Sequence, residues 1–399
     1  MTSAHRPESV PRVQSDAVNQ RARIVLLGAT GSIGRQACDV IERHPDRFQL
    51  VGAVVGRDAD GLTRLVHRFG IKQSAVVDPM SDAELPAGCT AGADAAADVA
   101  AMDADVVCVA ITGAAALRPA LAAVNAGRLV AVATKGVLVM AGDLVRRRAA
   151  AGGSRIVPVD SEHSAIWQCL RGEAAESVSR IVLTASGGPF LHRDLHDFAG
   201  ITAEQALNHP TWRMGPKVTT DSATMMNKGL EVVEAHFLFE VPYSKIGVVI
   251  HPTSLVHSYV EFVDGATKAQ LGVPDMRVPI ALALADGHRL PEVGPPLELT
   301  AVPSLEFIPL DDRRFPAVGV ARRAGERGGV APAVLNAANE VAVQSFLGGS
   351  CRFDQIVPAV AAVVDEAPEL PQPSLDDILA ADAWARAAAA DRLGRVVPV

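Results

Sequence analysis

The chain has 399 residues, a length that suggests two or three domains, and its 49% hydrophobic content provides for sizeable buried cores. A net charge of −8 excludes the positive surface expected of a nucleic-acid-binding protein and leaves any anionic substrate to be held by local groups. Five cysteines without a CxxC pair favour a reducing compartment, so we expect a cytoplasmic protein. Residues 1–20 are polar, which predicts a disordered tail rather than a secretory signal, and no apolar run is long enough to span a membrane.

From residue 21 to about residue 157, short apolar runs alternate with helical stretches. The runs RIVLLG, FQLVGAVVG, SAVVD, DVVCVAIT, RLVAVATK and RIVPVD are almost continuously apolar, as strands buried on both faces are. Their alternation with helices predicts an α/β fold that begins with a Rossmann-like, doubly wound parallel sheet.

The pattern changes after residue 157. Residues 158–289 mix strand-like runs (RIVLTAS, KIGVVI, VHSYVEF and ATKAQLGV) with polar loops, which predicts a central α+β domain that binds metal and substrate. A proline-rich stretch within residues 290–310 predicts a linker. Residues 311–399 have a helical pattern, including VLNAANEVAVQSFL and a last helix that Ser374 and Asp377 would cap, so we expect a C-terminal helical domain.

A glycine-rich motif, GATGSIG, lies at residues 28–34 between the first strand and the first helix. Glycines at this place let the backbone approach a pyrophosphate at the helix N-terminus, so the motif predicts a dinucleotide site; a tight turn without a ligand is the alternative. The second strand ends at Gly56, Arg57 and Asp58. Arg57 favours the 2′-phosphate of NADP, against the alternative of a solvated surface arginine, whereas Asp58 is of the type that selects NAD.

Acidic residues follow the strand RIVPVD. Asp160 and Glu162 are two residues apart, so on an extended backbone their side chains would point the same way. A third carboxylate, Glu231, ends the segment DSATMMNKGLE (221–231), which we interpret as a helix start. Converging carboxylates favour Mg²⁺ or Mn²⁺, and solvated loop acids are the alternative.

The same part of the chain carries groups suited to a phosphate. Ser222, Asn227 and Lys228 lie around the predicted helix start, where backbone N–H groups attract anions. Ser186 precedes two glycines that would let the backbone come close to a ligand. The structural alternatives are Ser222 as a helix cap, Lys228 as a surface cation and an ordinary Gly-Pro turn after Ser186.

A polar loop, NHPTWRMG (208–215), lies between these segments. Trp212 and Met214 on such a loop predict a lid that excludes water from the site, with Trp212 as a core residue as the alternative. His209 would contact the phosphate or act as an acid, although a lone histidine is more often structural.

Eight motifs occur in order along the chain: GATGSIG, VDSEHSAIWQ, SGGPF, NHPTWRMG, DSATMMNKGLE, HPTSLVHSYVEF, AQLGVPDMRVPI and LNAANEVAV. Together they resemble the 1-deoxy-D-xylulose 5-phosphate reductoisomerase family over nearly the whole chain after the tail. The resemblance implies a homodimer that uses NADPH to rearrange and reduce 1-deoxy-D-xylulose 5-phosphate to 2-C-methyl-D-erythritol 4-phosphate, in the non-mevalonate route to isoprenoid precursors. It implies retro-aldol cleavage and re-aldol joining, assisted by a metal ion, and then hydride transfer.

The resemblance also implies roles for individual residues. The metal, Mn²⁺ or Mg²⁺ with Co²⁺ also possible, would be bound by Asp160, Glu162 and Glu231. The implied substrate contacts are Lys135, Ser161, Glu162, Ser186, His209, Ser222, Asn227, Lys228 and Glu231, with Trp212 and Met214 in the lid. The implied NADPH contacts are Thr30, Gly31, Ser32, Ile33, Gly56, Arg57, Asp58, Thr134, Gly136 and Gly215.

One segment departs from the family pattern. Where the family has Ala-Asn-Lys-Glu-Ser, this chain has Ala-Thr-Lys-Gly-Val at residues 133–137. Thr134 replaces an amide and Gly136 replaces an acid, a loss of one hydrogen bond worth on the order of 1 kcal/mol, or roughly tenfold in affinity or rate. We interpret this as tuning of an active enzyme. The alternatives are a paralogue with shifted substrate or inhibitor sensitivity, a simple NADP-dependent dehydrogenase and a non-catalytic NADP-binding regulator.

Overall fold

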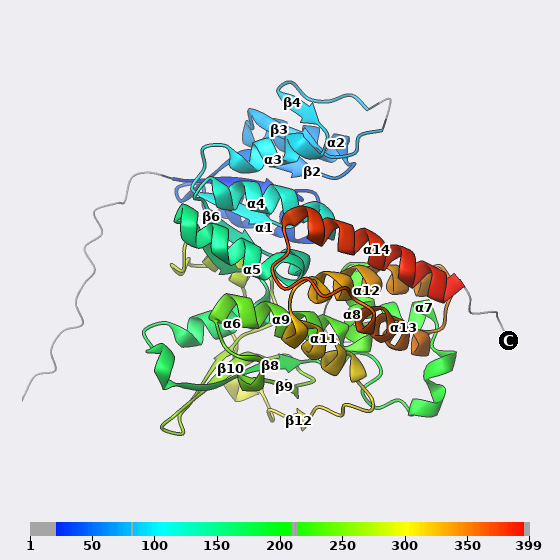
Figure 1. Ribbon diagram of the computed structural model, residues 1–399. Coiled ribbons are helices and arrows are strands. Elements are labelled where there is room, and N and C mark those ends of the chain that lie inside the picture. Colours follow the sequence, from blue (N-terminus) through cyan, green and yellow to red (C-terminus); the bar gives the residue numbers. More distant parts are fainter. Residues whose placement is uncertain (1–20, 81–82, 210–211, 213, 395–399) are drawn as a thin grey trace, which may run out of the picture.

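A computed structural model describes residues 21–394 except 81–82, 210–211 and 213, so the predicted tail at residues 1–20 lies outside the described residues. The chain begins with a seven-stranded sheet in which each strand is parallel to its neighbours (Figure 1). Six strands match the six predicted apolar runs, and the short edge strand β4 was not predicted. In spatial order they are β4 (Cys89–Ala91), β3 (Gln73–Val76), β2 (Phe48–Val55), β1 (Ala22–Leu27), β5 (Val106–Val109), β6 (Leu129–Val132) and β7 (Arg155–Pro158).

Strand β1 illustrates why both faces of this first sheet are covered. Ile24 and Leu26 point into one apolar cluster, and Val25 and Leu27 point into another on the opposite face. Because both faces are buried, the strands need apolar residues at every position, and the predicted doubly wound sheet is confirmed. The first cluster contains residues of α1 (Ser32–Arg43), α2 (Ala59–Phe69) and α10 (Arg277–Leu284), and the second contains residues of α3 (Ala93–Ala101), α4 (Leu117–Asn125) and α5 (Lys135–Gly152).

Two glycines determine how tightly α1 approaches the strands. Gly28 has a φ of 89°, and a Cβ atom there would collide with the backbone of Ala110 after β5. A Cβ atom at Gly34, in the first turn of α1, would collide with the backbone of Gly28 and Ala29. The missing side chains therefore bring the helix N-terminus close to the ends of β1 and β5.

A second, mixed sheet has five strands in the order β11-β10-β8-β9-β12. Strands β8 and β9 are parallel, and the other neighbouring pairs are antiparallel. Four of the strands were predicted, and β12 is an addition formed by the end of the predicted linker. The elements of this part are α6 (Ser161–Leu170), β8 (Val178–Ala185), α7 (Ala203–Leu207), α8 (Pro216–Thr224), α9 (Met226–Phe239), β9 (Ile246–Ile250), β10 (Val256–Phe262), β11 (Thr267–Leu271) and β12 (Ile308–Pro309).

The chain ends in four helices, whereas the sequence indicated three, in VLNAANEVAVQSFL, IVPAVAAVVDEA and SLDDILAADAWARAAAADRL. They are α11 (Pro316–Arg327), α12 (Ala331–Leu347), α13 (Phe353–Asp365) and α14 (Leu375–Gly394). Helix α12 packs against α11, α13 and α14 and also against α5 and α8 from earlier in the chain. The predicted cap is present, because Ser374 Oγ accepts from the backbone N of Asp377 at 3.2 Å. Short 3₁₀ helices lie at Ala114–Ala116, Ala175–Ser177, Leu195–Gly200, Tyr243–Lys245 and Leu299–Ala301.

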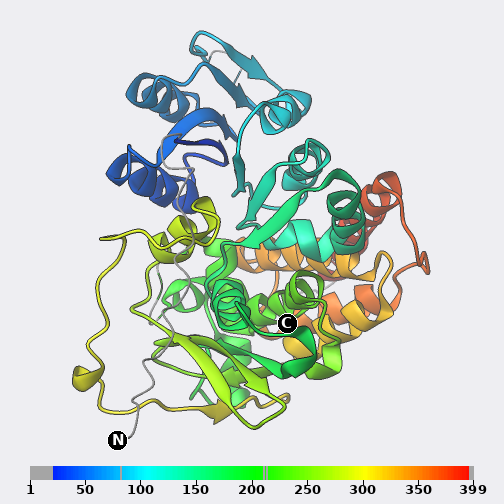
Figure 2. The ribbon, with the colours of Figure 1, turned by 90° about the vertical axis from the view of Figure 1, so that its left-hand side faces the viewer.

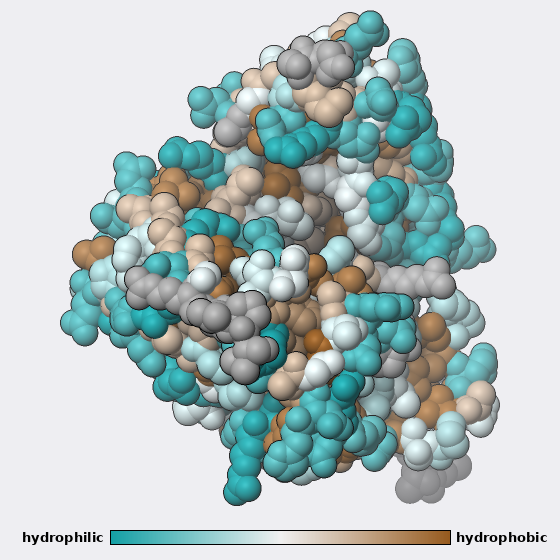
Figure 3. All heavy atoms as spheres, turned by 90° about the vertical axis from the view of Figure 1, so that its right-hand side faces the viewer, coloured by the Kyte–Doolittle hydropathy of each residue, from teal (hydrophilic) through white to brown (hydrophobic). Residues whose placement is uncertain are grey.

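The first sheet forms the top of the molecule, the second sheet forms the bottom, and the C-terminal helices lie beside α5 and α8 (Figures 1 and 2). Hydrophilic side chains cover much of the rim of the face drawn in Figure 3, and hydrophobic ones show mainly toward its middle. Among the described residues, no helix has both the length and the apolar composition to cross a membrane. All five cysteines are free thiols in the described part of the chain.

The glycine turn after β1 gives a stability prediction. Gly28→Ala places a methyl group both at a positive φ and against the Ala110 backbone, whereas Gly153→Ala meets the same kind of φ (69°) with no atom within 4 Å. We expect Gly153→Ala to cost roughly 1–2 kcal/mol from the φ alone. Gly28→Ala should cost roughly 1–3 kcal/mol more from overpacking, measured by urea unfolding. Equal losses in the two variants would contradict this account of the turn.

Candidate active site

The parallel first sheet brings distant residues to one edge. The glycine motif follows β1, Thr134 and Lys135 follow β6, and Asp160 follows β7. Because parallel strands end at the same edge, these residues lie along one rim of the sheet. Strand β1 has β2 on one side and β5 on the other, so the chain order reverses there, which is where nucleotides bind in such sheets.

Three carboxylates converge at this edge. Asp160 caps α6, Glu162 lies in the first turn of that helix, and Glu231 lies in α9. One oxygen from each lies within 4.8 Å of the others. The convergence was predicted, but the expected extended backbone was wrong, because β7 ends at Pro158 and Glu162 is helical.

Two lysines surround the carboxylates. Lys135 forms an ion pair with Asp160, and its Nζ lies 3.5 Å from Glu231 Oε1. Lys228 Nζ donates to Glu162 Oε1 at 2.7 Å and also pairs with Glu231. Burial opposes the charge of both ammonium groups, but the carboxylates outweigh it and raise both lysine pKa values. Lys228 is 3% exposed, so it is not a surface cation.

The carboxyl groups differ in proton affinity. Burial, followed by repulsion from Glu162, raises the pKa of Glu231 to about 8. Burial acts in the same direction on Asp160, yet Lys135 and His163 outweigh it and hold the pKa of Asp160 below its usual range. Two acids in one pocket with such different pKa values are typical of a functional site.

The donor set fits a hard divalent cation. The three carboxylates offer oxygen ligands, the type that Mg²⁺ and Mn²⁺ prefer. Neighbours hold two of them in place, because Asn227 Nδ2 donates to Glu231 Oε1 at 2.5 Å and Ser161 Oγ donates to Glu162 Oε2 at 2.6 Å. A cation between the carboxylates would offset their mutual repulsion and favour the ionised form of Glu231.

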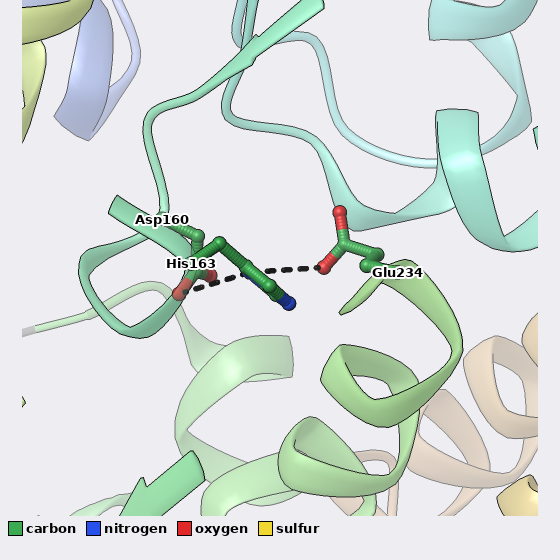
Figure 4. Close-up of side chains that lie close together, drawn as sticks. All are labelled: Asp160, His163 and Glu234. Atoms are coloured by element: carbon green, nitrogen blue, oxygen red, sulfur yellow. Dashed lines mark ion pairs between the residues drawn. The ribbon is translucent and has the colours of Figure 1, made fainter. Parts of the chain in front are cut away.

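The structure adds two buried residues, His163 and Glu234, that the sequence interpretation missed. His163 Nε2 donates to the backbone oxygen of Glu231 at 2.9 Å. Its Nδ1 lies 3.7 Å from Asp160 Oδ1 and 3.9 Å from Glu234 Oε2 (Figure 4). Burial raises the pKa of Glu234 to about 7. The available signal was spacing, since each residue follows a metal-site acid by three positions on a helix.

A second group of side chains surrounds His209. Its Nε2 lies 3.1 Å from Ser186 Oγ and 3.0 Å from Ser222 Oγ, and its Nδ1 accepts from the backbone N of Trp212 at 2.9 Å. Nε2 therefore carries the proton of the neutral ring. Burial lowers the pKa of His209, which favours that neutral form. Two hydroxyls thus lie within hydrogen-bonding distance of one imidazole N–H.

The segment that carries Ser222 differs from the predicted helix start. Helix α8 already contains Asp221 and Ser222, and α9 begins after Met225, which has a left-handed φ of 62°. Ser222 lies in the last turn of α8, so it is not an N-cap. A Cβ atom at Gly188 would lie 2.8 Å from the Ser222 backbone oxygen. That glycine therefore lets the loop approach α8, whereas we expected it to approach a ligand.

The residues predicted to form a lid follow His209 and precede α8 in the chain. Trp212 and Met214 are half-buried, and Gly215 is exposed and caps α8. The Trp212 ring lies 6.4 Å from the His257 ring. Trp212 is therefore not a core residue. Positions 210, 211 and 213 of this loop lie outside the described residues.

The glycine motif and the end of β2 form the predicted adenosine side. Gly31 caps α1 without a side-chain hydrogen bond, and its own N–H donates to Gly28 O at 3.0 Å. The N–H groups of the first helical turn, which begins at Ser32, are the ones that an anion could accept from. Asp58 caps α2 by accepting from Gly61 N at 2.8 Å. Arg57 follows Gly56, is 78% exposed and pairs with Asp78, with Nε 2.7 Å from Oδ2. The acid is thus engaged in the helix cap, while the arginine lies at the surface.

The departure from the family pattern lies near the end of β6. Thr134 is buried and donates to the backbone oxygen of Ile111 at 2.6 Å, so its hydroxyl ties β6 to the loop after β5. A Cβ atom at Gly136 would lie no closer than 3.7 Å to Gly113 and 3.9 Å to Asn336. A Cβ atom at this buried glycine would therefore meet only ordinary van der Waals contacts.

Comparison with known proteins shows the family to which the chain belongs. Residues 24–142 match the family described as 1-deoxy-D-xylulose 5-phosphate reductoisomerase, residues 156–239 match the C-terminal domain of that name, and residues 271–388 match the DXP reductoisomerase C-terminal domain. The chain belongs to the 1-deoxy-D-xylulose 5-phosphate reductoisomerase family.

Curated relatives of that name cover nearly the whole chain. The protein of Rhodococcus jostii (strain RHA1) is 49% identical over 92% of this chain and 93% of its own length. The protein of Leifsonia xyli subsp. xyli is 48% identical over 94% of this chain and 99% of its own length. The reductoisomerase of Zymomonas mobilis, solved in complex with NADPH, is 39% identical with a TM-score of 0.87, covering 94% of this chain and 100% of that one. A DOX-P reductoisomerase solved with NADPH, fosmidomycin and magnesium is 37% identical with a TM-score of 0.88. The match covers 93% of this chain and 98% of that one.

Metal binding at the trio should depend on pH. Because burial and Glu162 raise the pKa of Glu231 to about 8, this carboxyl is protonated below that pH and must lose its proton to become a ligand. We expect the Mn²⁺ dissociation constant to fall about tenfold per pH unit up to about pH 8, with about one proton released per ion. Calorimetry in buffers of different ionisation enthalpy measures both. Glu231→Gln should lose the pH dependence, and an affinity that is flat below pH 8 in the wild type would contradict the assignment.

Proposed function

We propose that this chain uses NADPH and a divalent metal ion to convert 1-deoxy-D-xylulose 5-phosphate into 2-C-methyl-D-erythritol 4-phosphate. The observation that carries the proposal is the convergence of Asp160, Glu162 and Glu231 at the carboxyl edge of a dinucleotide-type sheet. Membership of the reductoisomerase family and the complexes of its members with NADPH, fosmidomycin and magnesium support it.

At the metal end, Asp160, Glu162 and Glu231 hold Mg²⁺ or Mn²⁺, with Co²⁺ as a further candidate. When bound, the ion supplies Lewis-acid stabilisation to the carbonyl and hydroxyl oxygens of the substrate. Lys135 and Lys228 lie among the carboxylates and offer ammonium donors to the same oxygens. These donors orient the ketose for cleavage of one carbon–carbon bond and formation of another, which yields the aldehyde that hydride transfer reduces.

At the phosphate end, neutral and cationic donors surround one point. His209 offers Nε2–H, and Ser186 and Ser222 offer hydroxyls at about the same place. Asn227 and Lys228 follow on the first turn of α9 and connect the phosphate end to the metal end. Trp212 and Met214 close over the substrate and exclude water. With Ser161 beside Glu162, this set extends along the whole length of a phosphorylated ketose.

NADPH lies across the edge of the first sheet in this proposal and supplies the hydride when bound. The N-terminus of α1 holds the pyrophosphate, and Arg57 holds the 2′-phosphate. Lys135 lies beside both the nicotinamide end and the carboxylates, so hydride donor and substrate carbonyl share one pocket. The proposed cofactor residues are Thr30, Gly31, Ser32, Ile33, Gly56, Arg57, Asp58, Thr134, Gly136 and Gly215.

We also propose a homodimer that works in the cytoplasm. Leu299, Leu305 and Phe307 are large apolar side chains exposed on the linker beside the second sheet, the kind of surface that a partner subunit covers. The free thiols are consistent with a reducing compartment.

The division into domains at residues 21–157, 158–289, 290–310 and 311–399 stays a proposal. Helix α10 packs on the first sheet although it lies in the second of these ranges.

A simple dehydrogenase would use the dinucleotide site but would leave the carboxylate trio without a role. Purified protein given 1-deoxy-D-xylulose 5-phosphate, NADPH and Mn²⁺ should oxidise the cofactor, and a chelator should stop the reaction. We expect Glu231→Gln to lower kcat at least about 100-fold because it removes a metal ligand. Glu240→Gln, an exposed change at the end of the same helix, should leave kcat unchanged. Full turnover by Glu231→Gln would refute the metal assignment.

The position of Gly136 gives a prediction about cofactor affinity. Gly136→Glu would place a carboxylate at the second residue of α5, where a Cβ atom meets only ordinary van der Waals contacts, and the added hydrogen bond should tighten NADPH binding roughly tenfold. Fluorescence titration of NADPH measures the change. Gly136→Ala adds a side chain without a hydrogen-bonding group and serves as the control. If both variants bound NADPH equally, the position would have no polar role.

A further inference from the structure

Helix α12 carries polar residues that the proposed chemistry leaves unused. In the motif LNAANEVAV, Asn336 and Asn339 are separated by one turn of an otherwise mainly apolar helix and are 1% and 0% exposed. A buried amide is costly unless it is hydrogen-bonded, so each must have a partner that offsets its burial. Asn336 Nδ2 donates to Glu340 Oε1 on the same helix at 3.1 Å, whereas Asn339 bonds outside α12.

Asn339 reaches the segment that carries the phosphate-end residues. Its Nδ2 donates to Asp221 Oδ1 in α8 at 2.7 Å, and Lys217 Nζ donates to the other oxygen, Oδ2, at 2.8 Å. Asp221 is 1% exposed. Lys217 compensates the charge of Asp221, but loss of the Asn339 bond would leave the buried oxygen Oδ1 without that donor, so this contact ties α8 to the C-terminal helices.

The backbone of Asp221 continues the connection toward α9. Its carbonyl oxygen accepts from Thr224 Oγ1 at 3.2 Å, and Thr224 Oγ1 accepts from the backbone N of Met226 at 3.2 Å. These bonds span the left-handed residue Met225, where α8 ends and α9 begins. The position of Asp221 therefore affects both Ser222, its neighbour in sequence, and the first turn of α9.

We propose that Asn339 is a positioning residue for the phosphate end of the site. Its amide holds Asp221, and Asp221 in turn fixes Ser222 and the turn that leads to Asn227 and Lys228. The inference rests on the proposed function, because it takes those residues as the phosphate contacts. Asn339 acts through Asp221, so its loss should weaken binding of the phosphorylated ligand and have little effect on NADPH, because most of the proposed cofactor contacts follow β1, β2 and β6 of the first sheet.

The first test compares two amide-to-leucine changes on α12. We expect Asn339→Leu to raise KM for the sugar phosphate about tenfold, the loss of about one hydrogen bond, while the NADPH dissociation constant stays within about twofold. Gln344→Leu, at an exposed position of the same helix, should change neither. An unchanged KM in Asn339→Leu, or an equal loss of affinity for substrate and NADPH, would overturn the proposal.

A swap of the two partners keeps the test decisive if Asn339→Leu does not fold. Asn339→Asp alone places two carboxylates against each other and should raise KM more than Asn339→Leu does. Combining it with Asp221→Asn restores one amide and one carboxylate, and KM should return to within about threefold of the wild type. If the double variant had a KM as high as that of Asn339→Asp alone, the proposal would be overturned.

Inorganic phosphate separates this proposal from the proposed function. Calorimetric titration of phosphate into the NADPH complex should show the same loss of affinity in Asn339→Leu and the same recovery in the swap. If the wild type did not turn over 1-deoxy-D-xylulose 5-phosphate, the proposed function would fail, and the phosphate affinities would still decide the role of Asn339. Equal phosphate affinity in the wild type, Asn339→Leu and Asn339→Asp would overturn it.

Discussion

Mutual neutralisation of buried charges is the constraint on which this site depends. Three carboxylates and two ammonium groups share the pocket, and removing either set would leave the other uncompensated in a water-poor environment. With all five ionised the pocket carries one excess negative charge, which adds to burial, the main cause of the raised pKa of Glu231. A divalent cation bound there would reverse that sign and prepare the pocket for a phosphorylated anion. An acidic chain can thus bind an anionic substrate through local charge alone.

The fold supplies these charges from separate elements. Lys135 and Asp160 follow neighbouring parallel strands of the first sheet, whereas Lys228 and Glu231 lie on α9 above the second sheet. The contact between Lys135 and Glu231 joins the two parts across the pocket. Helix α12 packs against both α5 and α8, so the C-terminal helices support both the helix that begins at Lys135 and the helix that carries Ser222. Chemistry that needs metal, phosphate and nicotinamide in one place requires such a shared support.

The sequence predicted those features that local chemistry determines. Long apolar runs and the glycine motif indicated the first sheet, but β4 and β12 are three and two residues long, too short for a pattern. Acids after a strand indicated the trio, although the backbone at Glu162 is helical. The break between α8 and α9 could not be predicted, because Met225 adopts a φ that tertiary contacts impose and non-glycine residues rarely choose. His163 could not be told from a core histidine without its neighbours.

The departures from the family pattern lie at the end of β6 and the start of α5, on the proposed cofactor side. Thr134 bonds to backbone within the first sheet, and the nearest atoms to a Cβ at Gly136 belong to Gly113 and Asn336, so neither position contacts the carboxylates of the pocket. A regulator that had lost catalysis would have no reason to keep a buried cluster of five charged groups, because such clusters are expensive and apolar replacements often stabilise a protein. All five charged residues of the pocket are retained, and the departures lie at Thr134 and Gly136. This combination favours a working reductoisomerase with adjusted NADPH binding over a non-catalytic descendant.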